Sequence, residues 1–345
     1  MATKTNSGRF FEDFQLGETL VHATPRTLTE GDRSLYTGLY PSRFALASSD
    51  RFAQECGFEE SPLDDLIAFH VGFGKTVPDV SLNAVANLGY AECRFLKPVF
   101  PGDTISTTSD VIGWKENSNG KTGIVYVRST AMDQMDEPVL TWVRWVMVRK
   151  RDHAAAAPAS NIPELMSAVS PESLVVPEGL SFEGYDHALA GEPHRLNDYT
   201  IGEKIDHVDG VTIEEADHLT ATRLWQNTAK VHFNTQARED GRRLIYGGHI
   251  ISLARALSFN GLANAQMIAG INAGSHVNPC FAGDTVYAWS EVLDVAKTAT
   301  PSVGAIRLRL VATKDHALEM VLKAGDGKYA SGVLLDLDYW AFMPV

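Results

Sequence analysis

An amide, a lysine and a histidine fall within six positions of the segment LWQNTAKVHFNTQ (224–236), as Asn227, Lys230 and His232. Histidine has an ordinary pKa close to neutrality, so it can take up a proton and return it within one reaction cycle. An amide can orient water, but it does not accept a proton as a carboxylate does. These residue types can together carry out proton transfer at a histidine beside a water that an amide orients.

Each of these residues also has a purely structural explanation. His232 could be a loop histidine bonded to the backbone, and Lys230 could be a solvated surface charge. Asn227 could close the helix expected over 213–226, which has Thr212 as its N-cap candidate, because asparagine tolerates the left-handed backbone at a helix end. From the residues alone these alternatives stay open.

A second helix is expected over 248–262, in the segment GGHIISLARALSFNGL (247–262), which has no acidic residue and apolar side chains on nearly every face. Such a helix is enclosed by other elements. Its first N–H groups are free and carry the positive end of the helix dipole. Arg255, in mid-helix, either extends past its apolar neighbours to solvent or binds an anion.

The elements that position these residues occur twice along the chain. FQLGETLVHATPRTLTEGDRSLYTGLY (14–40) aligns without gaps with YTIGEKIDHVDGVTIEEADHLTATRLW (199–225), and KPVFPGDTI (97–105) aligns with NPCFAGDTV (278–286). After each expected core helix come segments that alternate or run apolar as strands do, such as TWVRWVMVRK (141–150) and SVGAIRLRLVAT (302–313). The order predicts helices followed by antiparallel sheet in each half.

The stretch 152–194 carries an alanine run and five prolines, a composition that interrupts regular structure. We interpret it as a linker draped over the surface. The predicted units are then 8–151 and 195–345, each of ordinary domain size.

Composition excludes several classes of protein. A formal net charge of −13 repels phosphate backbones, so nucleic acid is not an expected partner. Three scattered cysteines suggest neither a disulfide framework nor a zinc site, and the histidines show no metal-ligand spacing. No apolar run approaches the ~20 residues that span a bilayer, and the first residues lack a signal peptide's apolar stretch. We expect a cytoplasmic protein with no membrane partner.

A buried helix wrapped by an antiparallel sheet, twice in tandem, with KPVFPGD (97–103) between helix and strands, resembles the double hotdog proteins of the MaoC-like (R)-specific enoyl-CoA hydratase family. The resemblance covers almost the whole chain and implies an α+β fold of two tandem hotdog units. It also implies a hydro-lyase that acts on an acyl-CoA thioester and uses no metal and no cofactor beyond the CoA of the substrate.

The family's hydratase motif, Gly-Asp-x-Asn-Pro-x-His, implies that His232 is the catalytic histidine, but this chain departs from the motif. Asn227 stands where the family has the aspartate, so His232 alone must act as general base, unless another carboxylate such as Asp217 or Asp240 reaches the water. Gly248 matches the glycine that holds the thioester oxygen. Gly247 replaces a histidine that the family often has beside it.

The first unit has no such motif, since Ser42 and Ala47 lie opposite Asn227 and His232 in the repeat. In two-unit hotdogs the half without the catalytic residues commonly makes room for the acyl group. We extend that expectation to residues 8–151.

The resemblance is strongest to members that interconvert mesaconyl-CoA (2-methylfumaryl-CoA) and β-methylmalyl-CoA by syn addition and elimination of water. The free carboxylate of mesaconyl-CoA calls for a cation, for which Arg255, Lys230 and Arg43 are the candidates. Another branched or dicarboxylic enoyl-CoA is the alternative substrate.

Two other functions remain in view. A hotdog thioesterase typically needs a carboxylate at the buried helix, and only the first unit offers one, at Asp64 and Asp65. A non-catalytic acyl-CoA binder is the other. Hotdog units tend to pair their sheets, and a tandem chain can satisfy that pairing internally. We expect a homodimer of such tandem chains.

Overall fold

The computed structural model describes residues 4–314 and 320–345, and its centre is one sheet of ten strands. The strand order is β1-β3-β4-β5-β2-β7-β10-β9-β8-β6, and neighbouring strands are antiparallel. The strands are β1 (Thr19–Thr27), β2 (Ala84–Phe95), β3 (Thr104–Glu116), β4 (Thr122–Met132), β5 (Pro138–Arg149), β6 (Lys204–Thr212), β7 (Met267–His276), β8 (Thr285–Lys297), β9 (Val303–Thr313) and β10 (Val333–Pro344).

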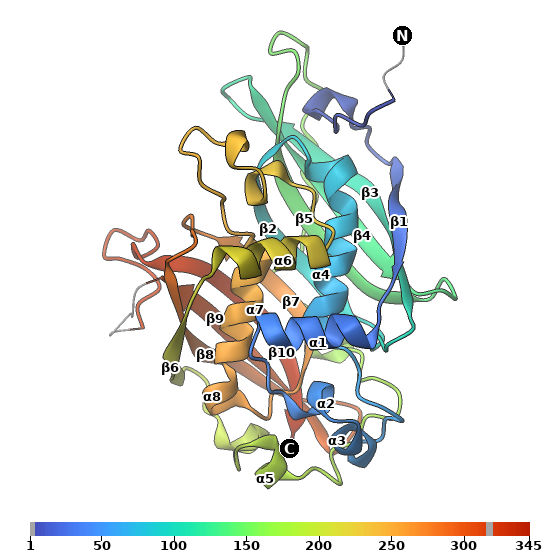
Figure 1. Cartoon of the computed structure of the whole chain (residues 1–345), viewed down its shortest axis with the longest axis vertical. Helices are drawn as coiled ribbons and strands as arrows, with labels where there is room; N and C mark the ends of the chain where they lie inside the picture. Colours follow the sequence, from blue (N-terminus) through green and yellow to red (C-terminus); the bar gives the residue numbers. More distant parts are fainter. Residues whose placement is uncertain (1–3, 315–319) are drawn as a thin grey trace.

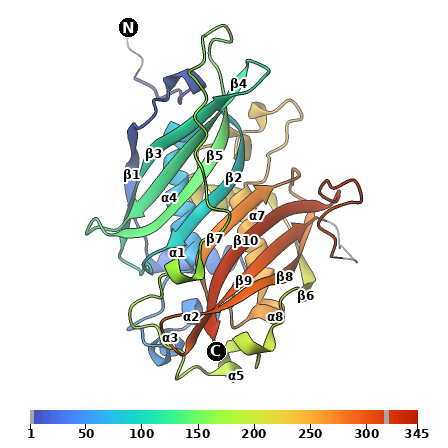
Figure 2. The ribbon, with the colours of Figure 1, turned by 180° about the vertical axis from the view of Figure 1, so that it is seen from behind.

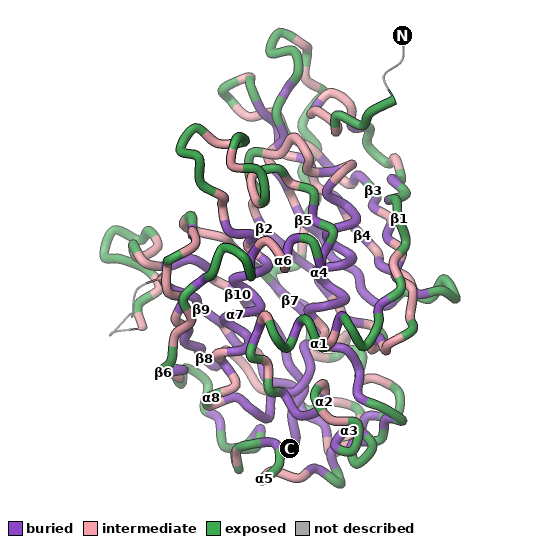
Figure 3. The backbone as a smooth tube through the Cα atoms, viewed as in Figure 1, coloured by how far each residue is buried: buried purple, intermediate pink, exposed green. Residues whose placement is uncertain are grey.

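Helices cover one face of this sheet (Figure 1). The α-helices are α1 (Glu30–Leu39), α2 (Ala45–Ser48), α3 (Asp50–Glu55), α4 (Asp65–Thr76), α5 (His187–Ala190), α6 (Glu215–Leu224), α7 (Gly247–Leu257) and α8 (Phe259–Leu262). Short 3₁₀ or π turns are η1 (Phe11–Asp13), η2 (Val77–Ser81), η3 (Pro171–Ser173), η4 (Leu196–Asp198), η5 (Lys230–His232) and η6 (Thr235–Ala237). Figure 3 shows α4 and α7 buried over nearly their whole length, while α1 and α6 alternate between buried and exposed positions. The predicted α+β class is confirmed.

The two halves of the chain share the sheet. β1 to β5 come from the first half and β6 to β10 from the second, and the halves meet where β2 pairs with β7, with Tyr90 opposite Gly274. Each half places one long buried helix, α4 or α7, against its own strands. The most extensive cluster of buried apolar side chains draws on both halves. The sheet and this cluster therefore hold the two halves together as one body.

The sequence repeat is visible at the level of single contacts. His22 Nε2 bonds Ser109 Oγ at 2.8 Å, and the matching pair in the second half, His207 Nε2 and Ser290 Oγ, is also 2.8 Å apart. Both histidines are buried on early strands, β1 and β6. Their role is to fasten a strand to its neighbour in each half.

The segment 152–194 crosses the face of the sheet opposite the helices (Figure 2). It forms a bridge from Asn161 to Trp114 of β3, and the Val169 carbonyl accepts a hydrogen bond from Trp340 Nε1 of β10 at 3.0 Å. The segment therefore touches strands of both halves. The exact limits of the two units, 8–151 and 195–345, stay a prediction.

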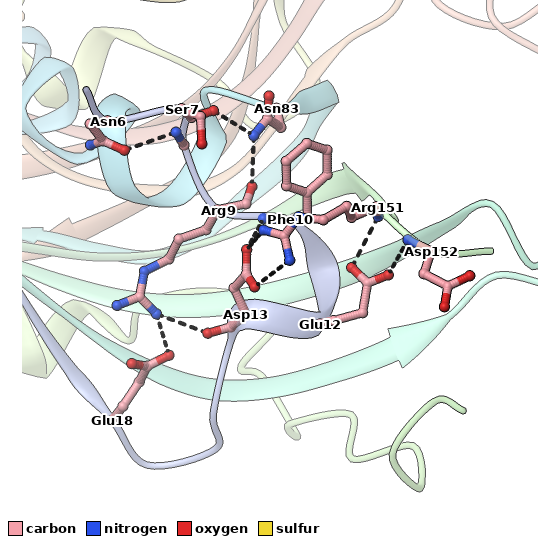
Figure 4. A network of polar contacts seen from close by, with 11 residues as sticks. Asn6, Ser7, Arg9, Phe10, Glu12, Asp13, Glu18, Asn83, Arg151 and Asp152 are labelled. Carbon is pink, nitrogen blue, oxygen red and sulfur yellow. Dashed lines mark hydrogen bonds and ion pairs between the residues drawn. The ribbon is translucent and has the colours of Figure 1, made fainter. Parts of the chain in front are cut away.

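The start of this linker is fastened to the N-terminal segment (Figure 4). The Arg151 guanidinium makes two bonds to the Asp13 carboxylate, of 3.0 and 2.5 Å. The backbone N–H groups of Arg151 and Asp152 donate to Glu12 at 3.2 and 3.0 Å. The chain entering the linker is therefore held against η1.

Two predictions about the helices of the second half are wrong. Thr212 ends strand β6 and bonds Thr285, and the N-cap of α6 is Glu214. The helix predicted over 248–262 is broken, because Asn260 has non-helical backbone angles and Gly261 has φ +94°. The carbonyl of Asn260 instead accepts a bond from His207 at 2.8 Å, so a tertiary contact replaces the last helical turn.

Candidate functional site

A cavity of about 260 Å³ lies where the two halves meet. The first half contributes side chains from α4, η2, β2 and β5. The second half contributes the loop after α6, the start of α7 and the chain leaving β7. The lining residues are Phe73, Val77, Ser81, Ala84, Val85, Ala86, Asn87, Tyr90, Arg144, Asn227, Ala229, Val231, His232, Leu244, Ile245, Tyr246, Gly247, Ile250, His276, Val277, Asn278, Pro279, Cys280 and Leu334.

His232 lies in η5 and lines this cavity. Its Nδ1 is 2.8 Å from the carbonyl oxygen of Leu244. A carbonyl only accepts, so Nδ1 carries the proton and Nε2 of the neutral ring is the acceptor. Burial lowers the pKa of His232 to about 4, although the bond to Leu244 opposes that shift. The ring is therefore neutral near pH 7 and can act as a base through Nε2.

Asn227 is buried and lines the same cavity. Its Oδ1 accepts a hydrogen bond from the Ala229 N–H at 3.0 Å, which directs the amide nitrogen to other partners. The left-handed residue after α6 is Gln226, with φ +52°, so the alternative in which Asn227 takes that position is wrong. No bond from the amide N–H groups of Asn227 is found within residues 4–314 and 320–345, so these groups can donate to a water in the cavity.

Helix α7 begins at the wall of the cavity with Gly247. Tyr246, its N-cap, is held by a bond of 2.8 Å from its N–H to His218 Nε2. A Cβ on Gly247 would lie 2.3 Å from Cε1 of His276, and one on Gly248 would lie 2.6 Å from Cε1 of His70. Neither position has room for a side chain. Gly247 is among the lining residues, and Gly248 lies one position deeper, between the rings of Tyr246 and His70.

The ring of His276 occupies the space that a side chain at Gly247 would need. An imidazole therefore lies next to Gly247, although Gly247 itself replaces the histidine that the family often has at that position. Its Nε2 is 3.0 Å from the hydroxyl of Tyr90, across the junction of the two halves. Cys280 also lines the cavity, but burial raises the pKa of its thiol to about 12. It is therefore not a thiolate nucleophile at neutral pH.

The three cations predicted to meet a free carboxylate do not line the cavity. Arg255 is buried and turns toward the other end of α7, where it donates to Ser258 and to the Ala265 carbonyl. Lys230 is exposed on the loop. Arg43 is also exposed, and its guanidinium stacks on Phe259 at 4.3 Å.

The acidic residues considered in the sequence lie elsewhere as well. Asp64 caps the start of α4, and Asp65 accepts a bond of 2.7 Å from the Ile268 N–H. Burial, followed by the charge of Asp64, raises the pKa of Asp65 to about 8. Asp217 and Asp240 are exposed. Among the described residues no aspartate or glutamate lines the cavity, so no carboxylate there replaces Asn227.

Arg144 is a lining residue that sequence reasoning missed. It stands in β5 on the same side as Trp142, Val146 and Val148, all of which are fully buried. Side chains two apart share a face of a strand. A lone cation on an otherwise apolar strand face was the signal in TWVRWVMVRK. Burial lowers the pKa of Arg144 to about 10, so it stays charged near pH 7.

The first half has a small recess of about 10 Å³ in the place that matches the cavity of the second half. Pro98 of the recess corresponds to Pro279 of the cavity in the sequence repeat. Asp65 and the linker residues Val175 and Pro177 also line it. A space of this size holds about one water molecule and no acyl group.

Metal-binding geometry is absent from residues 4–314 and 320–345, where no group of three or more His, Cys, Asp or Glu side chains is placed to hold an ion. Within the same residues no helix is both long and apolar enough to cross a membrane.

Comparison with known proteins shows which family the chain resembles along most of its length. A family model described as mesaconyl-CoA hydratase matches residues 1–322. The chain is 68% identical over 341 residues to "Mesaconyl-CoA hydratase" of Cereibacter sphaeroides, covering 99% of each chain. It is 59% identical over 351 residues to "Beta-methylmalyl-CoA dehydratase" of Chloroflexus aurantiacus, covering 100% of this chain and 99% of the other.

Solved structures agree with the fold. A putative MaoC domain protein dehydratase from Chloroflexus aurantiacus superposes with a TM-score of 0.97 at 58% identity, covering 99% of both chains. RV0216 of Mycobacterium tuberculosis, described as a double hotdog fold, gives a TM-score of 0.77 at 24% identity, covering 98% of this chain and 99% of that one. The predicted tandem hotdog architecture is confirmed.

Proposed function

The chain belongs to the mesaconyl-CoA hydratase family, and we propose that it interconverts mesaconyl-CoA and β-methylmalyl-CoA by adding and removing water. Mesaconyl-CoA is a conjugated thioester with a methyl group on C2 and a free carboxylate on C3. Hydration forms a C3–O bond and a C2–H bond. The site must therefore supply a base for water, a proton for C2 and donors for the thioester oxygen.

His232 is proposed as the base and the proton donor. Nε2 takes a proton from water as the water oxygen bonds to C3, and the C2=C3 electrons move toward the thioester carbonyl to form an enolate. The imidazolium then returns its proton to C2 on the same face, which gives syn addition. A ring with a pKa of about 4 is neutral before the step, and the imidazolium that forms from it is a strong acid for the return of the proton to C2. Asn227 positions the water through its amide N–H groups.

The start of α7 is proposed as the site of the thioester oxygen. The first N–H groups of the helix have no partners within it and carry the positive end of its dipole. The absence of side chains at Gly247 and Gly248 lets the oxygen approach those N–H groups closely. Gly247 faces the cavity directly, and Gly248 is the position that matches the family motif.

The observation that carries this proposal is a neutral histidine, fixed as a base by the Leu244 carbonyl, in a cavity without a carboxylate. A hotdog thioesterase typically needs a carboxylate to direct water at the carbonyl carbon. Asp64 and Asp65 both accept hydrogen bonds from backbone N–H groups, and neither of them lines the cavity. The site therefore favours addition of water to the double bond over thioester hydrolysis.

The test follows the absorbance of the conjugated thioester of mesaconyl-CoA while a thiol reagent detects free CoA. We expect loss of conjugation without free CoA in the wild type, and a decrease in kcat of about 10³-fold or more for His232→Ala. His153→Ala, an exposed linker position, serves as the matched control. Free CoA would indicate a thioesterase, and activity indifferent to His232→Ala would indicate that the base lies elsewhere.

The cytoplasmic location and the homodimer remain proposals from the sequence. Light scattering coupled to size-exclusion chromatography tests the homodimer, because a dimer doubles the 37.6 kDa mass of the chain.

A further inference from the structure

We propose that Arg144 binds the free carboxylate of a dicarboxylic acyl-CoA and so selects this substrate class over monocarboxylic ones. The inference rests on the proposed function for the position of the thioester. It assigns to the first half of the chain a chemical role that complements the base in the second half.

Arg144 is a buried charge that lacks an anionic partner. It is 0% exposed, and within residues 4–314 and 320–345 no carboxylate forms an ion pair with it. Removing a guanidinium from water is costly unless a counter-charge and hydrogen-bond acceptors replace the lost solvation. A ligand that brings an anion into the cavity supplies that missing partner.

The guanidinium is fixed in place but its donors are only partly used. Nη2 donates to Thr76 Oγ1 at 2.7 Å and to Ser81 Oγ at 3.4 Å, and the group stacks on the ring of Phe73 at 4.2 Å. Nε is buried and has no hydrogen-bond partner among the described residues. An arginine held on one side with donors left over on the other suits the two oxygens of a carboxylate.

Two further lining residues carry buried polar atoms that are unpaired within the described chain. They are the side-chain amide of Asn87, at both its nitrogen and its oxygen, and the hydroxyl of Tyr246. Buried polar atoms are normally satisfied, so a group of unsatisfied ones around one cavity indicates a polar ligand. The Asn87 amide nitrogen and the Tyr246 hydroxyl can both donate to a carboxylate oxygen.

The position of these groups fits the connectivity of the substrate. Arg144 and Asn87 come from β5 and β2 of the first half, whereas His232 and Gly247 come from the second half. In mesaconyl-CoA the carboxylate and the thioester stand at opposite ends of the double bond. Holding one end at Arg144 and the other at the start of α7 places the bond between them, where His232 can act.

The other buried cations do not compete for this role. Lys75 donates to the side chain of Gln226, and Arg255 donates to Ser258 and the Ala265 carbonyl. Lys150 forms an ion pair with Glu116. None of these three cations lines the cavity. Arg144 is the cation that both lines the cavity and lacks a counter-charge in the described part of the chain.

The first experiment measures binding without turnover. Methylsuccinyl-CoA and 2-methylbutyryl-CoA have no double bond to hydrate and differ by a carboxylate in place of a methyl group. By calorimetry we expect the wild type to bind methylsuccinyl-CoA at least tenfold more tightly. Arg144→Gln should weaken binding of methylsuccinyl-CoA about 30-fold, with less than about a threefold change for 2-methylbutyryl-CoA.

Two further variants sharpen the result. Arg149→Gln removes an exposed arginine from the same strand and should keep the preference. If Arg144→Gln does not fold, Asn87→Asp provides the test, because a fixed anion beside the ligand carboxylate should weaken methylsuccinyl-CoA selectively.

Equal affinities for the two ligands in the wild type would overturn the inference. So would equal losses for both ligands in Arg144→Gln, or the same loss in Arg149→Gln. The outcome is separate from the fate of the proposed function. If the protein prefers methylsuccinyl-CoA through Arg144 but does not hydrate mesaconyl-CoA, the inference about Arg144 holds and the proposed reaction is wrong. If it hydrates mesaconyl-CoA but shows no preference that depends on Arg144, the proposed reaction holds and the inference is wrong.

Discussion

The Nδ1–H of His232 donates to the carbonyl oxygen of Leu244 over 2.8 Å, and this contact fixes which ring nitrogen can act as a base. Together with burial, it defines the pH range in which the ring is active.

The pH profile of kcat/KM should show no inflection near 6.5. Because burial lowers the pKa of His232 to about 4, the ring is neutral above that value, and activity is lost only as the pH falls toward it. Titration of His232 should therefore leave the initial rates with mesaconyl-CoA nearly constant between pH 5 and pH 8. A tenfold fall between pH 7 and pH 5.5 would show that the base titrates with an ordinary histidine pKa.

Asn227→Asp should move this profile to higher pH. The new carboxylate lies in the same cavity as His232, and a nearby negative charge favours the imidazolium, so the pKa of the ring rises. Activity should then decline at a pH at least one unit higher than in the wild type. Asn227→Ala is the matched control, with a rate reduced about tenfold and an unshifted profile. Identical pH profiles for Asn227→Asp and the wild type would show that residue 227 does not lie close enough to the base to change its pKa.

Gly247→Ala should reduce both activity and stability, because its Cβ would lie 2.3 Å from the ring of His276. The ring is bonded to Tyr90 and has to move. We expect a destabilisation of about 1–3 kcal/mol, as for other overpacked sites, and kcat/KM at least tenfold lower. Adding His276→Ala should recover part of the lost stability, measured by thermal unfolding. A double variant less stable than the sum of its parts would contradict this account.

Acidification should destabilise the fold between pH 6.5 and pH 5. Burial lowers the pKa of six histidines to values from about 2 to about 4, namely those of His70, His207, His218, His232, His249 and His276. Below pH 6.5 these rings bind protons in the unfolded chain but not in the folded one, so each reduces the free energy of unfolding by about 1.4 kcal/mol per pH unit. The melting temperature should fall steadily from pH 7 to pH 5. A constant melting temperature would show that these rings are protonated in the fold.

The parts of the site that the sequence predicts are those set by local spacing. His232 follows Asn227 by five residues in one loop, and Gly247 and Gly248 open one helix, so a motif within a short segment can place them. The repeat likewise predicts that aligned residues of the two halves occupy equivalent places, as the matching contacts of His22 and His207 show.

Arg144 and His276 could not be placed in this way, because their surroundings are assembled from distant segments. Arg144 meets Thr76, which is 68 positions away in the chain, and His276 meets Tyr90, 186 positions away. A lone arginine on an apolar strand face indicates that the side chain is buried, but it does not reveal whether a cavity lies beside it. Arg255 was predicted to meet the substrate carboxylate, and it does not line the cavity for the same reason. Its apolar neighbours in the sequence do not show toward which end of the helix the side chain turns.

The pairing of β2 with β7 joins two halves that share one fold but differ in the residues they place at equivalent positions. In a dimer of identical single units, symmetry would place every substitution in both copies of the site, so a histidine and an arginine introduced into one site would enter the other as well. A fused chain is free of that constraint. Here one cavity takes the proposed base, His232, from one half and Arg144, a cation without an ion pair in the described residues, from the other, while Val175 and Pro177 help to line the small recess at the matching place. Because the recess has space for about one water molecule and the cavity is acyl-sized, titration with a CoA thioester should saturate at one ligand per chain rather than two.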